Sequence, residues 1–258
     1  PHPRFAAAKP GDGAKYMMGV LGDWKAHLDQ MVADGTVTPF KHDPDADVPA
    51  EFDSATNWPH CATTIADIRD QSNCGSCWAF AGAEAASDRM CIATQGALML
   101  PLSAQDLAFC SGIFSGSYGC AGGQIGTPWS EIKHSGAVTG GQFNATGPFG
   151  AGFCSDYSLP HCHHHGPQGT DPYPAEGAPG CPSASSPKCP KACDAAASPA
   201  HSSWSDDKIT FKGEIQSASG ESAIQQMIMA GGPVSTAFTV YSDFENYAGG
   251  VYKHTTGE

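Results

Sequence analysis

Residues 70–80 read D-Q-S-N-C-G-S-C-W-A-F and contain the residue types that nucleophilic attack on a carbonyl requires. Cys77 stands where an apolar, alanine-rich helix is predicted to begin. The unpaired N–H groups and the dipole of a helix N-terminus lower the pKa of a thiol, and the thiolate is the reactive form. Gln71 lies six residues upstream, and its carboxamide can donate a hydrogen bond to the oxyanion that forms after attack. The stretch therefore predicts a thiol nucleophile with an oxyanion donor, and Cys74 can anchor the loop between them.

A structural disulfide is the alternative interpretation of Cys77. The chain has 11 cysteines, which is many for a cytosolic protein and is typical of an oxidising compartment. Because the number is odd, five pairs leave one thiol free, as a cysteine enzyme requires. The complete string, with Gln71 and Trp78 included, favours the nucleophile.

The same string resembles the active-site segment of papain-like cysteine proteases, for which C-G-S-C-W is a specific signature. From Val48 the text V-P-A-E-F-D-S-A-T-N-W-P-H-C resembles the mature N-terminus of the cathepsin B-like group, and the similarity continues to Glu258. The earlier string K-Y-M-M-G-V-L-G resembles the end of that group's pro-segment. The resemblance implies an inhibitory pro-segment over residues 1–47 and a peptidase domain over residues 48–258. An ordinary flexible N-terminal extension remains the alternative for residues 1–47.

The expected fold is α+β, namely the papain-like arrangement of a helical N-terminal lobe and a β-barrel-like C-terminal lobe, the latter truncated. Apolar spacing predicts a short amphipathic helix over residues 23–32. The alanine-rich run after Cys77 predicts a buried helix. Ser219 is predicted to cap a helix that ends near Ala230 before Gly231-Gly232-Pro233. Alternation over residues 234–241 predicts a strand.

A second motif, G-C-A-G-G, spans residues 119–123. Glycine lets a peptide backbone approach closely because no Cβ intrudes. The resemblance implies that Gly122, Gly123 and Trp78 contribute to substrate binding. The family usually has Asn where this chain has Ala121, so the sequence departs from the pattern there.

The resemblance also implies a disulfide scheme that uses ten of the cysteines and leaves Cys77 free. The implied pairs are Cys61–Cys91, Cys74–Cys120, Cys110–Cys189, Cys154–Cys193 and Cys162–Cys181.

The string P-H-C-H-H-H-G-P spans residues 160–167, within an insertion over 154–193 that resembles the occluding loop of cathepsin B. The resemblance implies that His164 and His165 bind a substrate's C-terminal carboxylate, which gives dipeptidyl-carboxypeptidase activity, and that Asp70 latches the loop through His164. Histidine becomes charged in the acidic range where such a contact operates. A zinc site built from these histidines is a rival interpretation, and a solvated polar loop is another.

The composition of the chain limits the kinds of partner that it is expected to bind. The formal charge is −13, which disfavours nucleic acid because phosphate binding requires clustered Lys and Arg. No apolar run approaches the roughly 18–20 residues of a membrane span. Protein or peptide substrates and cystatin-type inhibitors are the expected partners, without a cofactor or a metal. Asn144 begins an N-glycosylation sequon, and a lysosomal, vacuolar or secreted location is expected.

The sequence shows no candidate for the general base that a cysteine protease needs. A cysteine protease needs a histidine to take the thiol proton and an acceptor to orient it, and no residue matches the family's catalytic His and Asn. His254 precedes the family position and is not assigned. The resemblance implies that both residues follow Glu258, so that the chain as written is expected to be an inactive fragment of a cysteine endopeptidase and peptidyl-dipeptidase. A non-catalytic secreted protein with a papain-like fold is the alternative function.

Overall fold

The computed structural model describes residues 18–161, 184–247 and 249–257. The α-helices and strands are α2 (Trp24–Ala33), β1 (Val37–Pro39), α3 (Ser54–Asn57), α4 (Ala62–Ile65), α5 (Cys77–Ala93), α6 (Ala104–Cys110), α7 (Thr127–His134), β2 (Ile215–Ser217) and α8 (Glu221–Gly231). Short 3₁₀ turns lie at Pro59–Cys61, Ile113–Ser115, Gly119–Ala121, Phe143–Ala145, Pro199–His201 and Ser242–Asn246.

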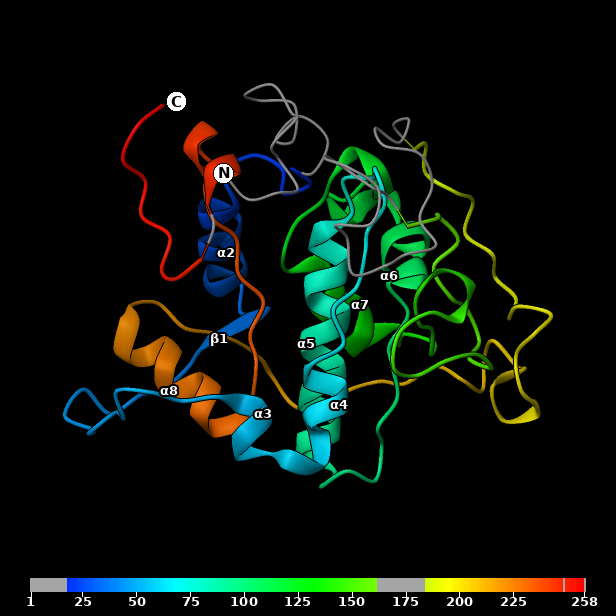
Figure 1. Cartoon of the computed structure of the whole chain (residues 1–258), viewed down its shortest axis with the longest axis horizontal. Coiled ribbons are helices and arrows are strands. Elements are labelled where there is room, and N and C mark those ends of the chain that lie inside the picture. Colours follow the sequence, from blue (N-terminus) through cyan, green and yellow to red (C-terminus); the bar gives the residue numbers. More distant parts are fainter. Residues whose placement is uncertain (1–17, 162–183, 248, 258) are drawn as a thin grey trace.

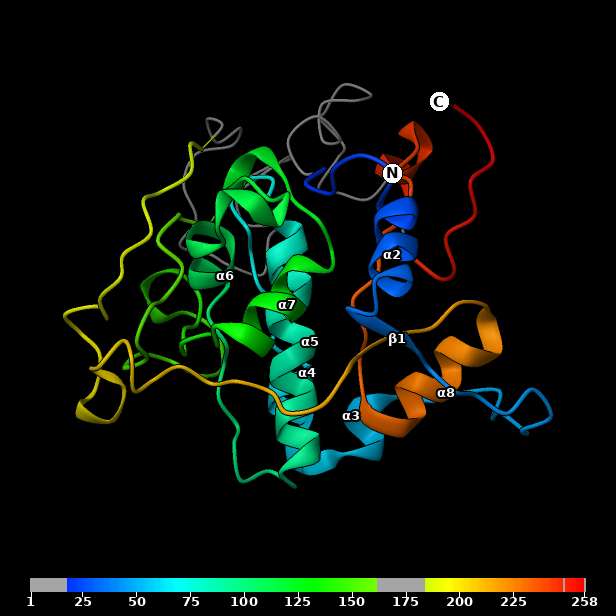
Figure 2. The ribbon, with the colours of Figure 1, turned by 180° about the vertical axis from the view of Figure 1, so that it is seen from behind.

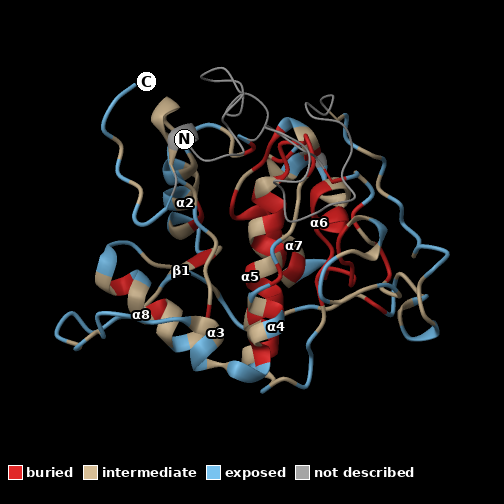
Figure 3. Cartoon of the chain, viewed as in Figure 1, coloured by how far each residue is buried: buried red, intermediate tan, exposed pale blue. Residues whose placement is uncertain are grey.

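The long helix α5 is the centre of the molecule (Figure 1). It packs against α4, α6 and α7, and α8 contacts it from the other side. Alanine, the best helix former, recurs along its sequence and leaves little side-chain bulk between it and its neighbours. The core around α5 consists mainly of Trp78, Phe80, Met90, Leu102, Leu107, Ile132 and Tyr157. Buried residues gather along α5, α6 and the adjoining loops, whereas α2 and α8 are largely half-buried or exposed (Figure 3).

The second part of the structure lies on the far side of α5 from α6 and contains α2, β1, β2 and α8 (Figure 2). Strands β1 and β2 form a two-stranded parallel sheet in which Val37 faces Ile215 and Pro39 faces Ser217. Arg89 of α5 joins this part to the central helix, because its guanidinium donates to the carbonyl oxygens of Met227, Gly232 and Pro233. These carbonyls lie in the last turns of α8 and just after it, so one arginine caps the C-terminal end of the helix and attaches it to α5.

The expected α+β class is confirmed, and so are the predicted helices. Asp23 caps α2 by accepting from the backbone N–H groups of Lys25 and Ala26. Two details were wrong. The N-cap of α8 is Gly220 and not Ser219, with the helix starting at Glu221. The strand predicted over residues 234–241 does not form, because no described strand lies beside this stretch to pair with it.

Four disulfides cross-link the described residues: Cys61–Cys91, Cys74–Cys120, Cys110–Cys189 and Cys154–Cys193. These are four of the five implied pairs, and Cys162 and Cys181 lie outside the described residues. Among the described cysteines, Cys77 alone is free. None of the described helices has the length and apolar character that a bilayer span requires.

A buried group of charges lies against α5. Asp67 and Arg69 form an ion pair of 2.7 Å with side chains only 3% and 1% exposed, and Arg69 also donates to the carbonyl oxygen of Leu102. Two carboxyls of α5 share this surrounding. Burial raises the pKa of Glu84 to about 8 and that of Asp88 to about 7, and the charge of Asp67 adds to both shifts while Arg69 opposes them. One guanidinium thus faces three acids.

This group makes the stability of the fold depend on pH. In the unfolded chain Glu84 and Asp88 titrate near 4.5 and 3.8, well below their folded values of about 8 and about 7. The folded state therefore binds more protons than the unfolded state between those limits, and stability falls as pH rises from about 4 to about 8.

We expect Glu84→Gln to be more stable than the wild type at pH 8 by roughly 1–3 kcal/mol, with little change at pH 4. Urea unfolding at both pH values measures this, and Glu214→Gln, at an exposed position, is the control. Equal pH dependence in wild type and Glu84→Gln would contradict the assignment.

Candidate active site

Cys77 is the first residue of α5, and its side chain is half-buried. The loop before the helix is held from both sides. Tyr157, which is 2% exposed, donates its hydroxyl to the carbonyl oxygen of Gln71 at 2.9 Å and also hydrogen-bonds the Ser76 hydroxyl at 2.9 Å. Phe80 packs edge-on against the Tyr157 ring. The position of Cys77 therefore depends on a buried tyrosine that follows it by 80 residues in the chain.

Gln71 lies within the same loop. Its side-chain nitrogen donates to the carbonyl oxygen of Cys74 at 2.7 Å. A carboxamide nitrogen carries two hydrogens, so this bond orients the group and leaves one hydrogen for another acceptor. The expected oxyanion donor is thus held on the nucleophile's own loop.

The glycine-rich segment lies beside this loop. The Cys74–Cys120 disulfide joins the two, and the Gly75 N–H donates to the Cys120 carbonyl oxygen at 3.1 Å. A Cβ on Gly123 would lie 2.5 Å from the indole ring of Trp78, so only glycine allows the backbone to pass there. Trp78 itself is 1% exposed and donates its indole N–H to the Gly119 carbonyl oxygen at 3.3 Å. The ring therefore supports the glycine segment from behind, and a role of Trp78 in binding substrate stays a prediction.

Residues 19–21 occupy the space between the nucleophile and the glycines. Gly123 donates its N–H to the Gly19 carbonyl oxygen at 2.7 Å and accepts from the Leu21 N–H at 3.0 Å, which makes an isolated parallel bridge around Val20. Leu21 packs on Gly122, where a Cβ would lie 2.7 Å from the Leu21 methyl group. The N–H of Gly19 donates to the Cys77 thiol. A Cβ on Gly19 would lie 2.1 Å from the Gly75 carbonyl oxygen, so glycine is required for this close contact.

Burial raises the pKa of the Cys77 thiol above its usual value. The N–H groups of Gly19, Trp78 and Cys77 itself act in the opposite direction but are outweighed. The expected lowering by the helix N-terminus is therefore exceeded by desolvation in this conformation. The thiol is therefore less acidic in this conformation than an exposed thiol, and part of its covering is the segment that includes Gly19.

The remaining predicted site residues are placed as follows. Asp70 accepts from the Ser72 N–H at 2.5 Å and so stabilises the turn at Ser72. His164 and His165 lie outside the described residues. Asn144 is exposed, in a turn with a positive φ of 52°. Within the described part of the chain, no group of histidine, cysteine and acidic residues has the arrangement of a metal site, and no histidine forms a hydrogen bond with the Cys77 thiol.

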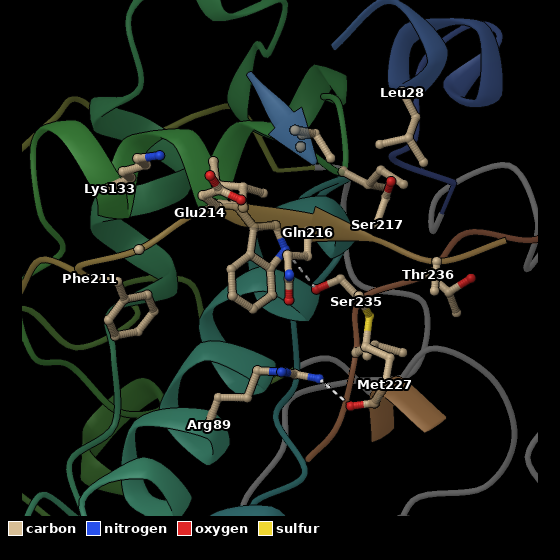
Figure 4. A pocket seen from close by; sticks show the side chains of 18 of the residues that line it. Leu28, Arg89, Lys133, Phe211, Glu214, Gln216, Ser217, Met227, Ser235 and Thr236 are labelled. Carbon is tan, nitrogen blue, oxygen red and sulfur yellow. Dashed lines mark hydrogen bonds between the residues drawn. The ribbon is translucent and has the colours of Figure 1, made fainter. Parts of the chain in front are cut away.

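A cavity of about 710 Å³ lies away from Cys77, between α2, α5, α7, α8 and β2. Figure 4 shows Leu28 of α2 at one end of this cavity and Arg89 of α5 at the other. The bond from Trp129 of α7 to the Ser235 hydroxyl, 3.3 Å long, crosses its wall. Because α2 and β1 form part of the lining, the cavity belongs to the junction between the N-terminal segment and the rest of the molecule.

Two contributors to the site were not found by sequence reasoning. Tyr157 carries no local signal, because its partners are distant in sequence. Gln124, whose side chain donates to the Leu21 carbonyl oxygen, carries no local signal for the same reason. The glycine of K-Y-M-M-G-V-L-G is Gly19, and its close contact with Gly75 leaves no room for a side chain there.

The described residues thus bring together a free cysteine at the start of a buried helix, a neighbouring carboxamide and a glycine segment that pairs with residues 19–21. A family profile described as papain family cysteine protease matches residues 48–258. The chain belongs to the papain family of cysteine proteases, and it is cathepsin B-like.

Individual relatives agree with this assignment. The chain is 44% identical over 224 residues to cathepsin B-like cysteine proteinase 4 of Caenorhabditis elegans, covering 84% of this chain and 61% of the relative. It is 38% identical over 218 residues to a cathepsin B-like cysteine proteinase of Schistosoma japonicum, covering 84% of this chain and 58% of the relative. The chain thus spans less than two thirds of the length of these curated relatives. The solved structure of procathepsin B S9 from Trypanosoma congolense matches with a TM-score of 0.64 at 25% identity, covering 95% of this chain and 68% of that one.

Proposed function

We propose that the chain is the latent form of a cathepsin B-like cysteine peptidase, with residues 1–47 as its pro-segment and Cys77 as its nucleophile. The observation that carries the proposal is the contact of Gly19 with the Cys77 thiol, beside the pairing of residues 19–21 with Gly123. A peptide backbone already lies along the glycines in the extended form that a substrate would adopt. The site is therefore suited to peptides and is covered by part of its own chain.

The chemistry proposed is attack of the Cys77 thiolate on a peptide carbonyl. The carbonyl π electrons move to oxygen, and the free N–H of Gln71 stabilises the resulting oxyanion. Collapse of this intermediate expels the amine, which takes up a proton, and leaves an acyl-enzyme thioester that water hydrolyses. The step needs a base for the thiol proton, and the described residues offer no histidine in contact with the thiol.

Latency follows from two effects of the N-terminal segment. Gly19 lies against the proposed nucleophile, and burial raises the pKa of its thiol. Residues 42–49 are almost entirely exposed and without helix or strand, which makes them suitable for the cut that separates residues 1–47 from the domain. Beyond this cut, the β1–β2 pairing must also break before the segment leaves.

The proposal extends to the setting in which the peptidase works. Four disulfides support an oxidising route to a lysosomal, vacuolar or extracellular location, and the exposed Asn144 is accessible for glycosylation. Protein substrates and cystatin-type inhibitors would bind along the uncovered glycine segment. Carboxydipeptidase activity would depend on His164 and His165.

Labelling by a peptidyl epoxide tests the nucleophile. We expect Cys77 to react slowly in the intact 258-residue chain, because Gly19 covers it. After cleavage within residues 42–49 and removal of the released peptide at acid pH, we expect labelling at Cys77 to increase at least about tenfold. Peptide mass spectrometry locates the label, and Cys77→Ser is the control that must stay unlabelled. Labelling of other cysteines alone, or none at Cys77 after removal, would overturn the proposal.

Two substitutions of Asp70 test the latch to His164. Asp70→Asn keeps an oxygen that accepts from the Ser72 N–H but removes the charge, whereas Asp70→Ala removes both. If the charge holds the loop closed, both variants of the active protease lose carboxydipeptidase activity relative to endopeptidase activity at acid pH by roughly threefold or more, the size of an exposed ion pair. Near pH 8 the difference from wild type vanishes because the histidine is neutral. If Asp70→Asn behaves as wild type and only Asp70→Ala changes the ratio, the residue serves the turn and the latch is wrong.

A further inference from the structure

The contact between the N-terminal segment and the cleft contains one bond that the backbone does not supply. Gly123 makes two backbone bonds, to Gly19 and to Leu21. Beyond them, the side chain of Gln124 donates its Nε2 to the carbonyl oxygen of Leu21 at 3.0 Å. The side chain of Gln124 thus adds a third hydrogen bond, to the Leu21 carbonyl, which the backbone of Gly123 does not reach.

Gln124 is held firmly for this role. Its backbone N–H donates to the Ser117 hydroxyl at 3.0 Å. The Ser117 hydroxyl donates to Thr127 at 2.8 Å, and the Thr127 hydroxyl donates to the Ser115 carbonyl oxygen at 3.0 Å. Ser117 and Thr127 are each 5% exposed. A buried chain of hydroxyl groups therefore holds the backbone at Gln124, and restraint of this kind reduces the entropy lost on binding.

The other half of the carboxamide has no use in the covered state. Gln124 Oε1 is buried and lacks a hydrogen-bond partner among the described residues. A buried acceptor left without a partner costs free energy, and a peptide N–H is a donor that would satisfy it. A carboxamide offers both a donor and an acceptor, so it can bind either group of an extended backbone.

We infer that Gln124 is a substrate-positioning residue of the site and that it binds peptide backbone. It holds the Leu21 carbonyl in the latent form and holds a substrate's backbone amide at the same position after the segment leaves. The recognised ligand is an extended peptide that reaches at least two residues past the one at Cys77, whatever its side chains. This inference rests on the proposed function, because it takes residues 19–21 as the occupant of the substrate cleft.

The accessibility of Cys77 in the full chain tests the inference. Gly19 covers the thiol, so a variant of Gln124 can change this accessibility only through its hold on residues 19–21. The rate of alkylation of Cys77 by iodoacetamide is measured in the 258-residue chain near pH 9 and located by peptide mass spectrometry. Gln124→Met keeps the length of the side chain and its neutrality but cannot donate to Leu21. We expect it to raise the alkylation rate about two- to tenfold, the effect of one neutral hydrogen bond. Gln124→Leu, a second neutral replacement, should act in the same direction.

Two controls make the result decisive. Gln30→Met alters an exposed glutamine of the same N-terminal segment and should leave the rate unchanged. Gly19→Ala places a Cβ against the Gly75 carbonyl oxygen and should give the fast rate of an uncovered thiol. If Gly19→Ala is fast while both Gln124 variants match the wild type, the inference is overturned and the proposed function stands. If Gly19→Ala stays as slow as the wild type, residues 19–21 do not cover Cys77, and the proposed function falls with the inference.

Discussion

The site depends on the link between the loop that leads to Cys77 and the glycine segment of residues 119–123. The Cys74–Cys120 disulfide closes a separation of 46 residues, and the bond from Gly75 to the Cys120 carbonyl oxygen reinforces it. A closure of that length contributes about 2–4 kcal/mol, mainly by restricting the unfolded chain. It holds the loop that leads to Cys77 beside the glycine segment, and residues 19–21 pair with Gly123 there. The contacts of Gly19 and Leu21 follow from this geometry.

The proposed latency combines two effects of the covering segment, which limits access to Cys77 and excludes water from its thiol. A helix N-terminus favours a thiolate, yet burial raises the pKa of Cys77. In the proposed latent form, the covering segment would thus limit access to Cys77 and also make its thiol less acidic. On the proposed activation, loss of the segment would return water to the first turn of α5, where the helix N–H groups favour the thiolate.

The sequence predicted the parts of the site that depend on local pattern. Cys77 at the start of a helix, the free thiol and the helices α2, α5 and α8 follow from composition and spacing, and the resemblance supplied the disulfide pairs. Tyr157 and Gln124 were missed because their roles arise from partners brought together only by folding. The strand over residues 234–241 was wrong because alternation describes a half-buried surface but does not supply a neighbouring strand. The raised pKa of Cys77 was missed because desolvation depends on what covers the thiol.

The central claim is that residues 19–21 form a backbone pair with Gly123 over the nucleophile. Amide hydrogen exchange of Leu21, followed by NMR in the 258-residue chain, tests it most directly, because that N–H donates to the Gly123 carbonyl oxygen. The account predicts that the Leu21 amide exchanges at least about tenfold more slowly than an amide of the exposed stretch at Asp47, as a bonded amide in a stable contact does. Exchange of Leu21 as fast as that of Asp47 would contradict it.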